Sequence, residues 1–274
     1  MLSLAILTTV LLPLVSAHGR VTNITTSSGV VYQGWDPEMA LKTSKPPPLA
    51  AWSASNLGNI FVPPDQFNTS NITCHFNAKA GDVHVNTTAG DTLKLRWNEW
   101  PNSHKGPVLT YLASCNTTCA GVDKDKLRWV KIDQQGWLNS SGWEELGGTW
   151  ASDILIANGF TWTVKVPTDL AEGAYVLRHE IIALHVANEA DGAQAYPQCV
   201  NLSVGKGQVS VQGTKKKIDG GVQGEKLYGE KDKGILVDIH HKISGYDIPG
   251  PAVWSGATGI KQPNEQRKMR RISR

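Results

Sequence analysis

The chain has 274 residues, a formal net charge of +3 at pH 7 and 40% hydrophobic residues. This length suits one large domain with a substantial core. The charge gives no support for nucleic-acid binding, because most of it comes from the last residues, 261–274, and the body of the chain is near neutral.

Residues 1–17 have the pattern of a secretory signal peptide. They are almost wholly apolar and end in the small-x-small triplet Val15-Ser16-Ala17. A retained membrane anchor is disfavoured, since a spanning helix needs about 18 or more apolar residues. The sequence therefore predicts a secreted, extracellular protein without a membrane segment, whose mature chain begins at His18.

Short segments of alternating apolar and polar residues follow, bounded by turn residues. Residues 93–97, 162–166 and 200–204 show this pattern, and residues 175–184 are more continuously apolar, as in a central strand. Such segments predict an all-β fold, an antiparallel β-sandwich of the immunoglobulin or fibronectin type. Trp97, Trp129 and Trp162 are expected in its core.

Three further segments carry specific expectations. The proline-rich residues 36–49 predict a long irregular loop. Residues 234–237 predict one more strand, and the ordered domain is expected to span residues 18–256. The polar, basic residues 257–274 are expected to be a disordered tail.

Seven N-x-Ser/Thr sequons in an exported chain predict N-glycosylation. They lie at Asn23, Asn68, Asn71, Asn86, Asn116, Asn139 and Asn201.

The four cysteines predict two disulfides, with three possible pairings. Cys115 and Cys119 bracket a loop short enough to close locally, in which case Cys74 and Cys199 form a long-range bridge. A zinc site built on these cysteines is the less favoured alternative in an exported protein.

A metal site is the first candidate for chemistry. Cleavage after Ala17 gives His18 a free α-amino group beside its imidazole, so both nitrogens can chelate one ion. A second imidazole would complete a planar set of three nitrogens, which suits copper. On its own an N-terminal histidine is weak support.

The second imidazole is predicted to be His104. It lies in a loop of turn residues, 100–107, that follows an alternating segment. The alternatives fit less well: His75 follows a cysteine, His84 precedes a strand, and the adjacent His240 and His241 would point to opposite faces of a strand.

Four motifs together resemble the fungal lytic polysaccharide monooxygenases of auxiliary activity family 9, formerly glycoside hydrolase family 61. They are His18-Gly19 after the signal peptide, W-P-x-S-H-x-G-P-V at residues 100–108, R-H-E-I-I-A-L-H at 178–185, and G-A-Q-x-Y-P-x-C at 192–199. They occur in the family's order, and the resemblance runs from His18 to about residue 256.

The resemblance implies one copper ion held by the amine and Nδ1 of His18 and by Nε2 of His104. Tyr196 would lie on the axial side, and His185 and Gln194 would hydrogen-bond the oxygen co-substrate. It also implies the disulfides Cys74–Cys199 and Cys115–Cys119. His179, in the same motif as His185, is expected to pack inside.

The implied activity is oxidative cleavage of β-1,4-linked glucans, chiefly cellulose, with an external electron donor and O2 or H2O2. The substrate would meet a flat surface around the copper, formed by long loops. Tyr246 is the first candidate for stacking on sugar rings, with Tyr32 and Trp35 behind it. We expect a monomer that binds polysaccharide.

Two other classes of function stay open. One is a non-catalytic copper- or carbohydrate-binding protein on the same scaffold. The other is a glycoside hydrolase, which needs a pair of carboxyl groups. Glu99, Glu144, Glu145 and Glu180 are candidates for that pair by residue type only.

Overall fold

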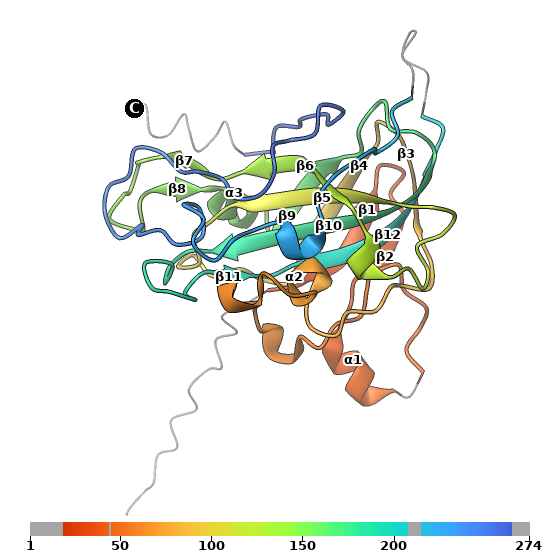
Figure 1. Ribbon diagram of the computed structural model, residues 1–274, viewed down its shortest axis with the longest axis horizontal. Helices are drawn as coiled ribbons and strands as arrows, with labels where there is room; N and C mark the ends of the chain where they lie inside the picture. The colour runs from red at the N-terminus through yellow and green to blue at the C-terminus, as the bar shows by residue number, and fades with distance from the viewer. Residues whose placement is uncertain (1–18, 44, 208–214, 265–274) are drawn as a thin grey trace, which may run out of the picture.

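Two β-sheets form the body of the molecule in the computed structural model, which describes residues 19–43, 45–207 and 215–264 (Figure 1). In spatial order the first sheet contains β2 (Val31–Gln33), β1 (Val21–Thr26), β4 (Thr92–Trp97) and β9 (Thr161–Lys165). The second contains β3 (Val85–Thr88), β12 (Gln198–Gly205), β10 (Gly173–Ala183), β5 (Val108–Cys115) and β6 (Trp129–Gln135), with β11 (Gln194–Ala195) paired to β10. A two-stranded ribbon joins β7 (Trp137–Asn139) to β8 (Thr149–Trp150). The predicted sandwich is confirmed.

Among the strands of the described residues, neighbours are antiparallel except for the parallel pair β12 and β3. In β4 the side chains of Leu93, Leu95 and Trp97 are each at most 1% exposed, whereas the residues between them face outward. They pack against inward residues of the second sheet such as Leu112 and Val200. Period-two alternation places every second residue on the buried face, so these strands could be read from the sequence.

Strand β10 is buried on both faces, which explains why its sequence is continuously apolar. Every residue after Gly173 is buried, and β5 and β12 pair with its two edges. One face packs into the core between the sheets and the other into a second apolar cluster that includes Trp129 and Trp150. The predicted core positions of Trp97, Trp129 and Trp162 are confirmed.

The prediction of an irregular loop over residues 36–49 is wrong in part, because helix α1 occupies Pro37–Lys42. The Asp36 carboxylate accepts a hydrogen bond from the Glu38 backbone N–H, and Pro37 opens the first turn, which together make a favourable helix start. The remaining helical segments are α2 (Asn71–Cys74), α3 (Ala151–Ala157) and the 3-10 turns η1 (Leu57–Asn59), η2 (Pro64–Gln66), η3 (Lys124–Lys126) and η4 (Gly224–Lys226).

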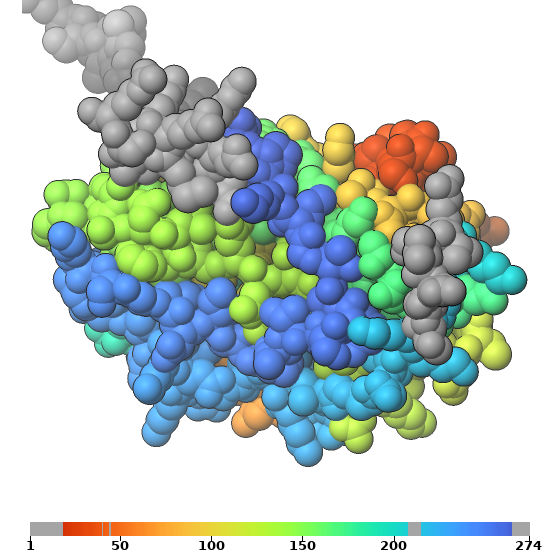
Figure 2. Space-filling model, turned by 90° about the horizontal axis from the view of Figure 1, so that it is seen from above, coloured from red at the N-terminus to blue at the C-terminus, as the bar shows by residue number. Residues whose placement is uncertain are grey.

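After residue 215 the chain runs over one face of the sandwich, where it is blue in Figure 2. Residues 234–237 are not the predicted strand: they form a turn whose buried Ile235 is 1% exposed and whose Val237 N–H donates to the Ala187 carbonyl. This segment is held by the buried Ile235 side chain and by turn hydrogen bonds, and not by the hydrogen-bond ladder of a strand.

The predicted domain end at residue 256 comes too early. Gln262 is 4% exposed and forms two hydrogen bonds with the backbone of Thr163 in β9, one through each atom of its amide. The packed chain therefore continues at least to Asn264, whose amide donates to the Ala157 carbonyl. The rest of the predicted tail, residues 265–274, lies outside the described residues.

Both disulfides implied by the resemblance are present. The long-range disulfide joins Cys74 to Cys199 across 125 residues, and the local disulfide joins Cys115 to Cys119. No cysteine is left over for the alternative zinc site.

The predicted glycosylation sites differ in exposure. Asn68, Asn86 and Asn116 are exposed, and Asn23, Asn71 and Asn139 are partly exposed. Asn201 is fully buried: its Oδ1 accepts from the Trp52 indole N–H at 2.6 Å and its Nδ2 donates to the Gly81 carbonyl at 2.7 Å. A sugar on Nδ2 would have no room, so the folded structure is incompatible with the predicted glycan at Asn201.

Candidate metal centre

The predicted ligand His18 lies outside the described residues, but the chain that follows it is firmly placed. A side chain at Gly19 would put its Cβ 2.2 Å from the Glu99 carbonyl oxygen, so only glycine fits this close approach. Arg20 and Asn98 exchange two hydrogen bonds, one from each backbone N–H. The first described residues are thereby fixed against the segment that leads to His104.

His104 sits in the loop between β4 and β5 and is 6% exposed. The Trp100 indole N–H donates to its carbonyl at 2.8 Å, and its own N–H donates to the Pro101 carbonyl at 3.1 Å. The Ser103 hydroxyl lies 3.1 Å from its Nδ1. These contacts orient the ring, and Nε2 is the nitrogen that the family motif assigns to the metal.

His185 meets His104 from the end of β10. The two ring centroids are 3.9 Å apart with an interplanar angle of 32°. His185 is partly exposed, because β10 stops at Ala183 and the chain turns toward the surface there. The resemblance predicted that these two histidines belong to one site, and the structure brings them together.

Tyr196 and Gln194 come from the short strand β11 and the residues after it. β11 pairs with the last residues of β10, and the Tyr196 N–H donates to the Ile181 carbonyl. The Tyr196 hydroxyl donates to Oε1 of Gln194 at 2.9 Å. Burial raises the pKa of the Tyr196 hydroxyl well above its usual range, so the phenol stays protonated.

The Trp100 ring lies between His104 and Tyr196 and contacts both. Its ring meets the Tyr196 ring edge-on with centroids 5.0 Å apart, and the His104 ring with centroids 6.0 Å apart. The sequence motif contained Trp100 and Ser103, but their roles were not predicted. Their proximity to the histidine in the motif was the available signal.

A buried ion pair anchors the same loop to α3. Lys105 Nζ lies 2.6 Å from Asp153 Oδ1, and the two side chains are only 8% and 7% exposed. The Asp153 carboxylate also accepts from the Trp150 N–H, and Ser152 and Gly106 exchange two hydrogen bonds. Sequence reasoning missed this contact, because 48 residues separate its partners and no local pattern links them.

The donor set fits copper better than a hard cation. The described residues gathered here offer imidazoles from His104 and His185 and the phenol of Tyr196. Within the described ranges no group of three or more His, Cys, Asp or Glu side chains forms a complete metal cage. Among the described residues the site supplies one fixed loop imidazole, and imidazole ligands favour copper among divalent metals.

The five other described histidines serve elsewhere. His179 is buried as expected, with its Nδ1 3.0 Å from the Thr110 hydroxyl, and burial lowers its pKa to about 3. Burial also lowers the pKa of His75 to about 4, and its Nε2 contacts the Ile60 carbonyl. His84 accepts from the Cys119 N–H, and His240 and His241 are exposed beside Asp238.

The substrate-binding role of the three predicted aromatic residues stays a prediction. Each of the three side chains forms a hydrogen bond with the backbone. The Tyr246 hydroxyl donates to the Gly234 carbonyl, and its ring meets that of Trp150 edge-on. The Trp35 indole N–H donates to the Ala54 carbonyl. Tyr32 lies beside β3, where its hydroxyl accepts from the Asn86 N–H.

Sequence comparison gives a match to the profile of Auxiliary Activity family 9 (formerly GH61) over residues 18–246. The chain is 43% identical to AA9 family lytic polysaccharide monooxygenase I of Botryotinia fuckeliana, over 90% of this chain and 88% of that protein. It is 46% identical to AA9 family lytic polysaccharide monooxygenase A of Talaromyces verruculosus, over 89% of this chain and 71% of that protein.

Solved structures give the same result for the fold. The extended catalytic domain of H. jecorina LPMO9A superposes with a TM-score of 0.80 at 44% identity, covering 89% of this chain and 94% of that one. Cel61B of Hypocrea jecorina superposes with a TM-score of 0.78 at 38% identity, covering 86% of this chain and 100% of that one.

Proposed function

The chain belongs to Auxiliary Activity family 9 and is a lytic polysaccharide monooxygenase, and from this premise we propose that it is secreted and that it cleaves β-1,4-linked glucans, chiefly cellulose. The copper dependence of the family agrees with the nitrogen-rich site around His104. An external reductant and O2 or H2O2 would complete the reaction.

The proposed ligands are the amine and Nδ1 of His18 and the Nε2 of His104. Copper bound there supplies the one-electron chemistry by which O2 or H2O2 oxidises a carbon of the glycosidic bond. The protein holds His104 rigid through the Trp100 and Ser103 contacts, so its imidazole needs no reorganisation before it binds.

Three residues would act on the oxygen co-substrate without binding copper strongly. Gln194 Oε1 accepts from the Tyr196 hydroxyl, which turns its amide NH2 toward other partners as a hydrogen-bond donor. The partly exposed His185 can donate or accept a proton beside His104. Tyr196, which burial holds protonated, would place a neutral phenol in the site when copper is bound.

Hydrolysis by paired carboxylates has less support. Glu180 is fully buried and forms an ion pair with Arg178, so it cannot reach a sugar. The single observation that carries the oxidase proposal is the convergence of His104, His185, Gln194 and Tyr196 from two segments about 90 residues apart in the sequence.

Export is proposed from the apolar residues 1–17, which lie outside the described ranges. Among the residues described, no helix is long and apolar enough to cross a membrane. Tyr246, Tyr32 and Trp35 are proposed to contact the polysaccharide, and the protein is proposed to act as a monomer.

The test is to incubate the copper-loaded protein with cellulose, with and without ascorbate, and to analyse soluble products by mass spectrometry. Oxidised oligosaccharides only with ascorbate support the proposal. Neutral oligosaccharides without ascorbate would indicate a hydrolase, and no soluble product would indicate a binding protein. The His104→Ala variant should lose the oxidised products, and the exposed His240→Ala variant should keep them.

The proposed role of the His18 amine has a separate test. A protein that retains Ala17 lacks that amine, so its copper affinity in calorimetry should fall by at least a hundredfold while its unfolding temperature without copper stays the same. Equal copper affinity for the two forms would remove His18 from the site.

A further inference from the structure

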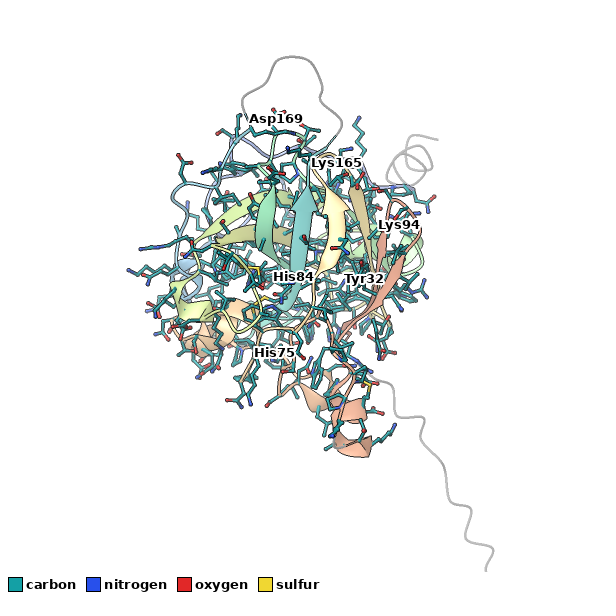
Figure 3. The ribbon with its side chains drawn as sticks, turned by 90° about the vertical axis from the view of Figure 1, so that its right-hand side faces the viewer. Tyr32, His75, His84, Lys94, Lys165 and Asp169 are labelled. Carbon is teal, nitrogen blue, oxygen red and sulfur yellow. A yellow bond between two sulfur atoms is a disulfide. The ribbon has the colours of Figure 1, made fainter. Side chains whose placement is uncertain are left out.

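A large hollow opens far from His104 along the strands of the second sheet. Its volume is about 730 Å³, and its lining includes His84, Asn86, Thr117, Thr118, Glu172 and Ser203. It lies where β10 begins and β12 ends, whereas His185 follows the opposite end of β10. Figure 3 shows His84 and Tyr32 on the side of the molecule that carries it.

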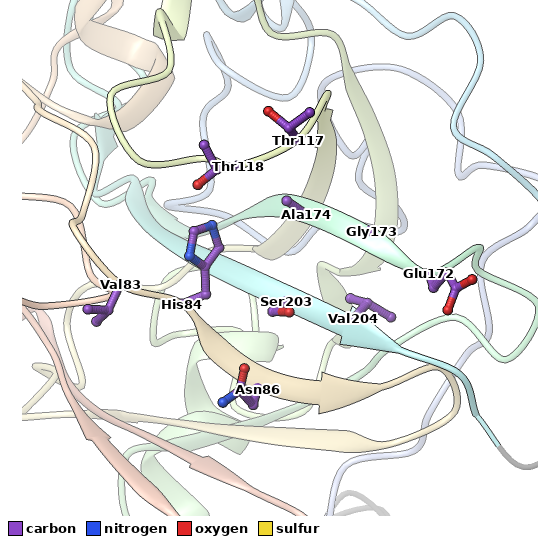
Figure 4. A pocket seen from close by; sticks show the side chains of 10 residues that line it. All are labelled: Val83, His84, Asn86, Thr117, Thr118, Glu172, Gly173, Ala174, Ser203 and Val204. Atoms are coloured by element: carbon purple, nitrogen blue, oxygen red, sulfur yellow. The ribbon is translucent and has the colours of Figure 1, made fainter.

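The lining is suited to a neutral, hydroxyl-rich ligand. In Figure 4 the threonines of the loop after β5 stand across from Asn86 of β3, with Ser203 of β12 between them. Three hydroxyls and one carboxylate offer hydrogen bonds, and Val83 and Val204 add apolar surface. His84 is neutral, because burial lowers its pKa and its Nε2 accepts from the Cys119 N–H. Glu172 is the one charged side chain among the described residues of this lining, so they form no cluster of charges that would bind an ion.

One side chain in the lining is itself an attachment point for sugar. Asn86 begins the sequon Asn86-Thr87-Thr88 and is exposed, since the alternation of β3 buries Val85 and Thr87 and turns Asn86 outward. Its backbone N–H is held by the Tyr32 hydroxyl, so the residue has a fixed position at the wall of the hollow. The neighbouring sequon residue Asn116 is exposed too, but it does not line the hollow.

We propose that Asn86 carries an N-linked glycan and that the first sugars of this glycan lie in the hollow. A hollow of this volume is in the range of sites that hold a drug-sized ligand, and it is open on the side from which Asn86 reaches it. The proposal rests on the proposed secretion of the chain and not on its copper chemistry.

The attachment uses the ordinary chemistry of the secretory pathway. A transferase moves an oligosaccharide from a lipid-linked diphosphate donor to Asn86. The bond between sugar carbon one and the diphosphate oxygen breaks, a bond from that carbon to Nδ2 forms, and Nδ2 loses one proton. No oxidation or reduction takes place.

The experiment compares Asn86 with Asn116 in protein secreted from a fungal host. Glycopeptide mass spectrometry should find a glycan at Asn86. Under native conditions an endoglycosidase should release it at least tenfold more slowly than the Asn116 glycan, and after denaturation the two rates should become equal. An unmodified Asn86, or equal native release rates, overturns the proposal.

Two variants test whether the Asn86 glycan lies in the hollow or is only crowded by neighbouring side chains. Ser203→Arg fills the hollow without altering the Asn86 sequon, and should raise the native release rate of the Asn86 glycan to that of Asn116. Asn86→Gln should lower the unfolding temperature of the secreted protein, whereas Asn116→Gln should not. Unchanged slow release from Ser203→Arg would contradict the seating. Copper-dependent cellulose oxidation, measured in parallel, shows separately whether the proposed function holds.

Discussion

The ion pair between Lys105 and Asp153 gives the sharpest prediction for stability. Replacing Lys105 by methionine keeps the apolar stem but removes the ammonium that lies 2.6 Å from the Asp153 carboxylate. That carboxylate is 7% exposed, so water replaces the lost cation poorly. The Trp150 N–H remains as one of its hydrogen-bond donors.

The expected cost follows from the burial of both partners. Removing one partner of a buried ion pair destabilises a protein by about 3–5 kcal/mol. In a domain of this size, 1 kcal/mol shifts the unfolding temperature by roughly 2–4 °C. Lys105→Met should therefore unfold roughly 6–20 °C below the parent protein. Because residues 104–106 are held by the same contacts to α3, copper affinity should fall in parallel.

Calorimetry of the copper-free protein measures the first effect and titration with copper the second. Lys126→Met is the matched control, because Lys126 forms an ion pair with Asp123 in which both side chains are more than half exposed. It should change the unfolding temperature by less than about 2 °C. The double variant Lys105→Met/Asp153→Asn should recover much of the loss, since no buried charge remains and the asparagine Oδ1 can still accept from the Trp150 N–H.

If Lys105→Met unfolds within about 2 °C of the parent, or if the double variant is no more stable than Lys105→Met alone, the buried ion pair does not stabilise the fold in this way.

Three further predictions concern pH, glycosylation and the disulfides. The folded-state pKa values of His75 and His179, about 4 and about 3, lie below the unfolded value of 6.5, so the unfolded chain takes up protons first as the pH falls. Stability should thus be complete above pH 6.5 and fall by about 2 kcal/mol per histidine between pH 6.5 and 5; a level denaturant midpoint over this interval would contradict it. Asn201 should be unmodified in glycopeptide maps, and Asn201→Ala should cost about 2–4 kcal/mol in denaturant unfolding through its two buried partners. Replacing both cysteines of the long-range disulfide by alanine should cost about 5 kcal/mol against about 2 kcal/mol for the local one, because the closed loops differ so much in length; equal losses would argue against the loop-length account.

Much of the fold could be predicted because its strands are amphipathic or wholly apolar over short distances. The alternation of Leu93, Leu95 and Trp97 with polar residues predicts β4. The continuous apolar run that forms β10 predicts a strand buried on both faces. The disulfide pairing and the grouping of His104, His185, Gln194 and Tyr196 came from motifs that resemble a known family.

Where the sequence misled, a local pattern had more than one solution. Proline-rich residues 36–49 read as a loop, yet the Asp36 cap and Pro37 make a helix start as well as they make a turn. The apolar residues 234–237 read as a strand, although the tertiary structure uses Ile235 as one buried anchor. The sequence placed Gln262 in a polar tail, because no neighbouring residue indicates that its amide will hydrogen-bond the backbone of β9.

The sequence by itself determined the strand pattern, the cysteines, the sequons and the motifs that carry the predicted metal-site residues, since each is written in neighbouring residues. Only the tertiary structure decided which sequon is buried, that Lys105 meets Asp153, and that Asn86 borders a hollow. The physical reason is that burial, ion pairing and cavity shape depend on segments brought together by folding, and no local period of the chain encodes which distant segments meet.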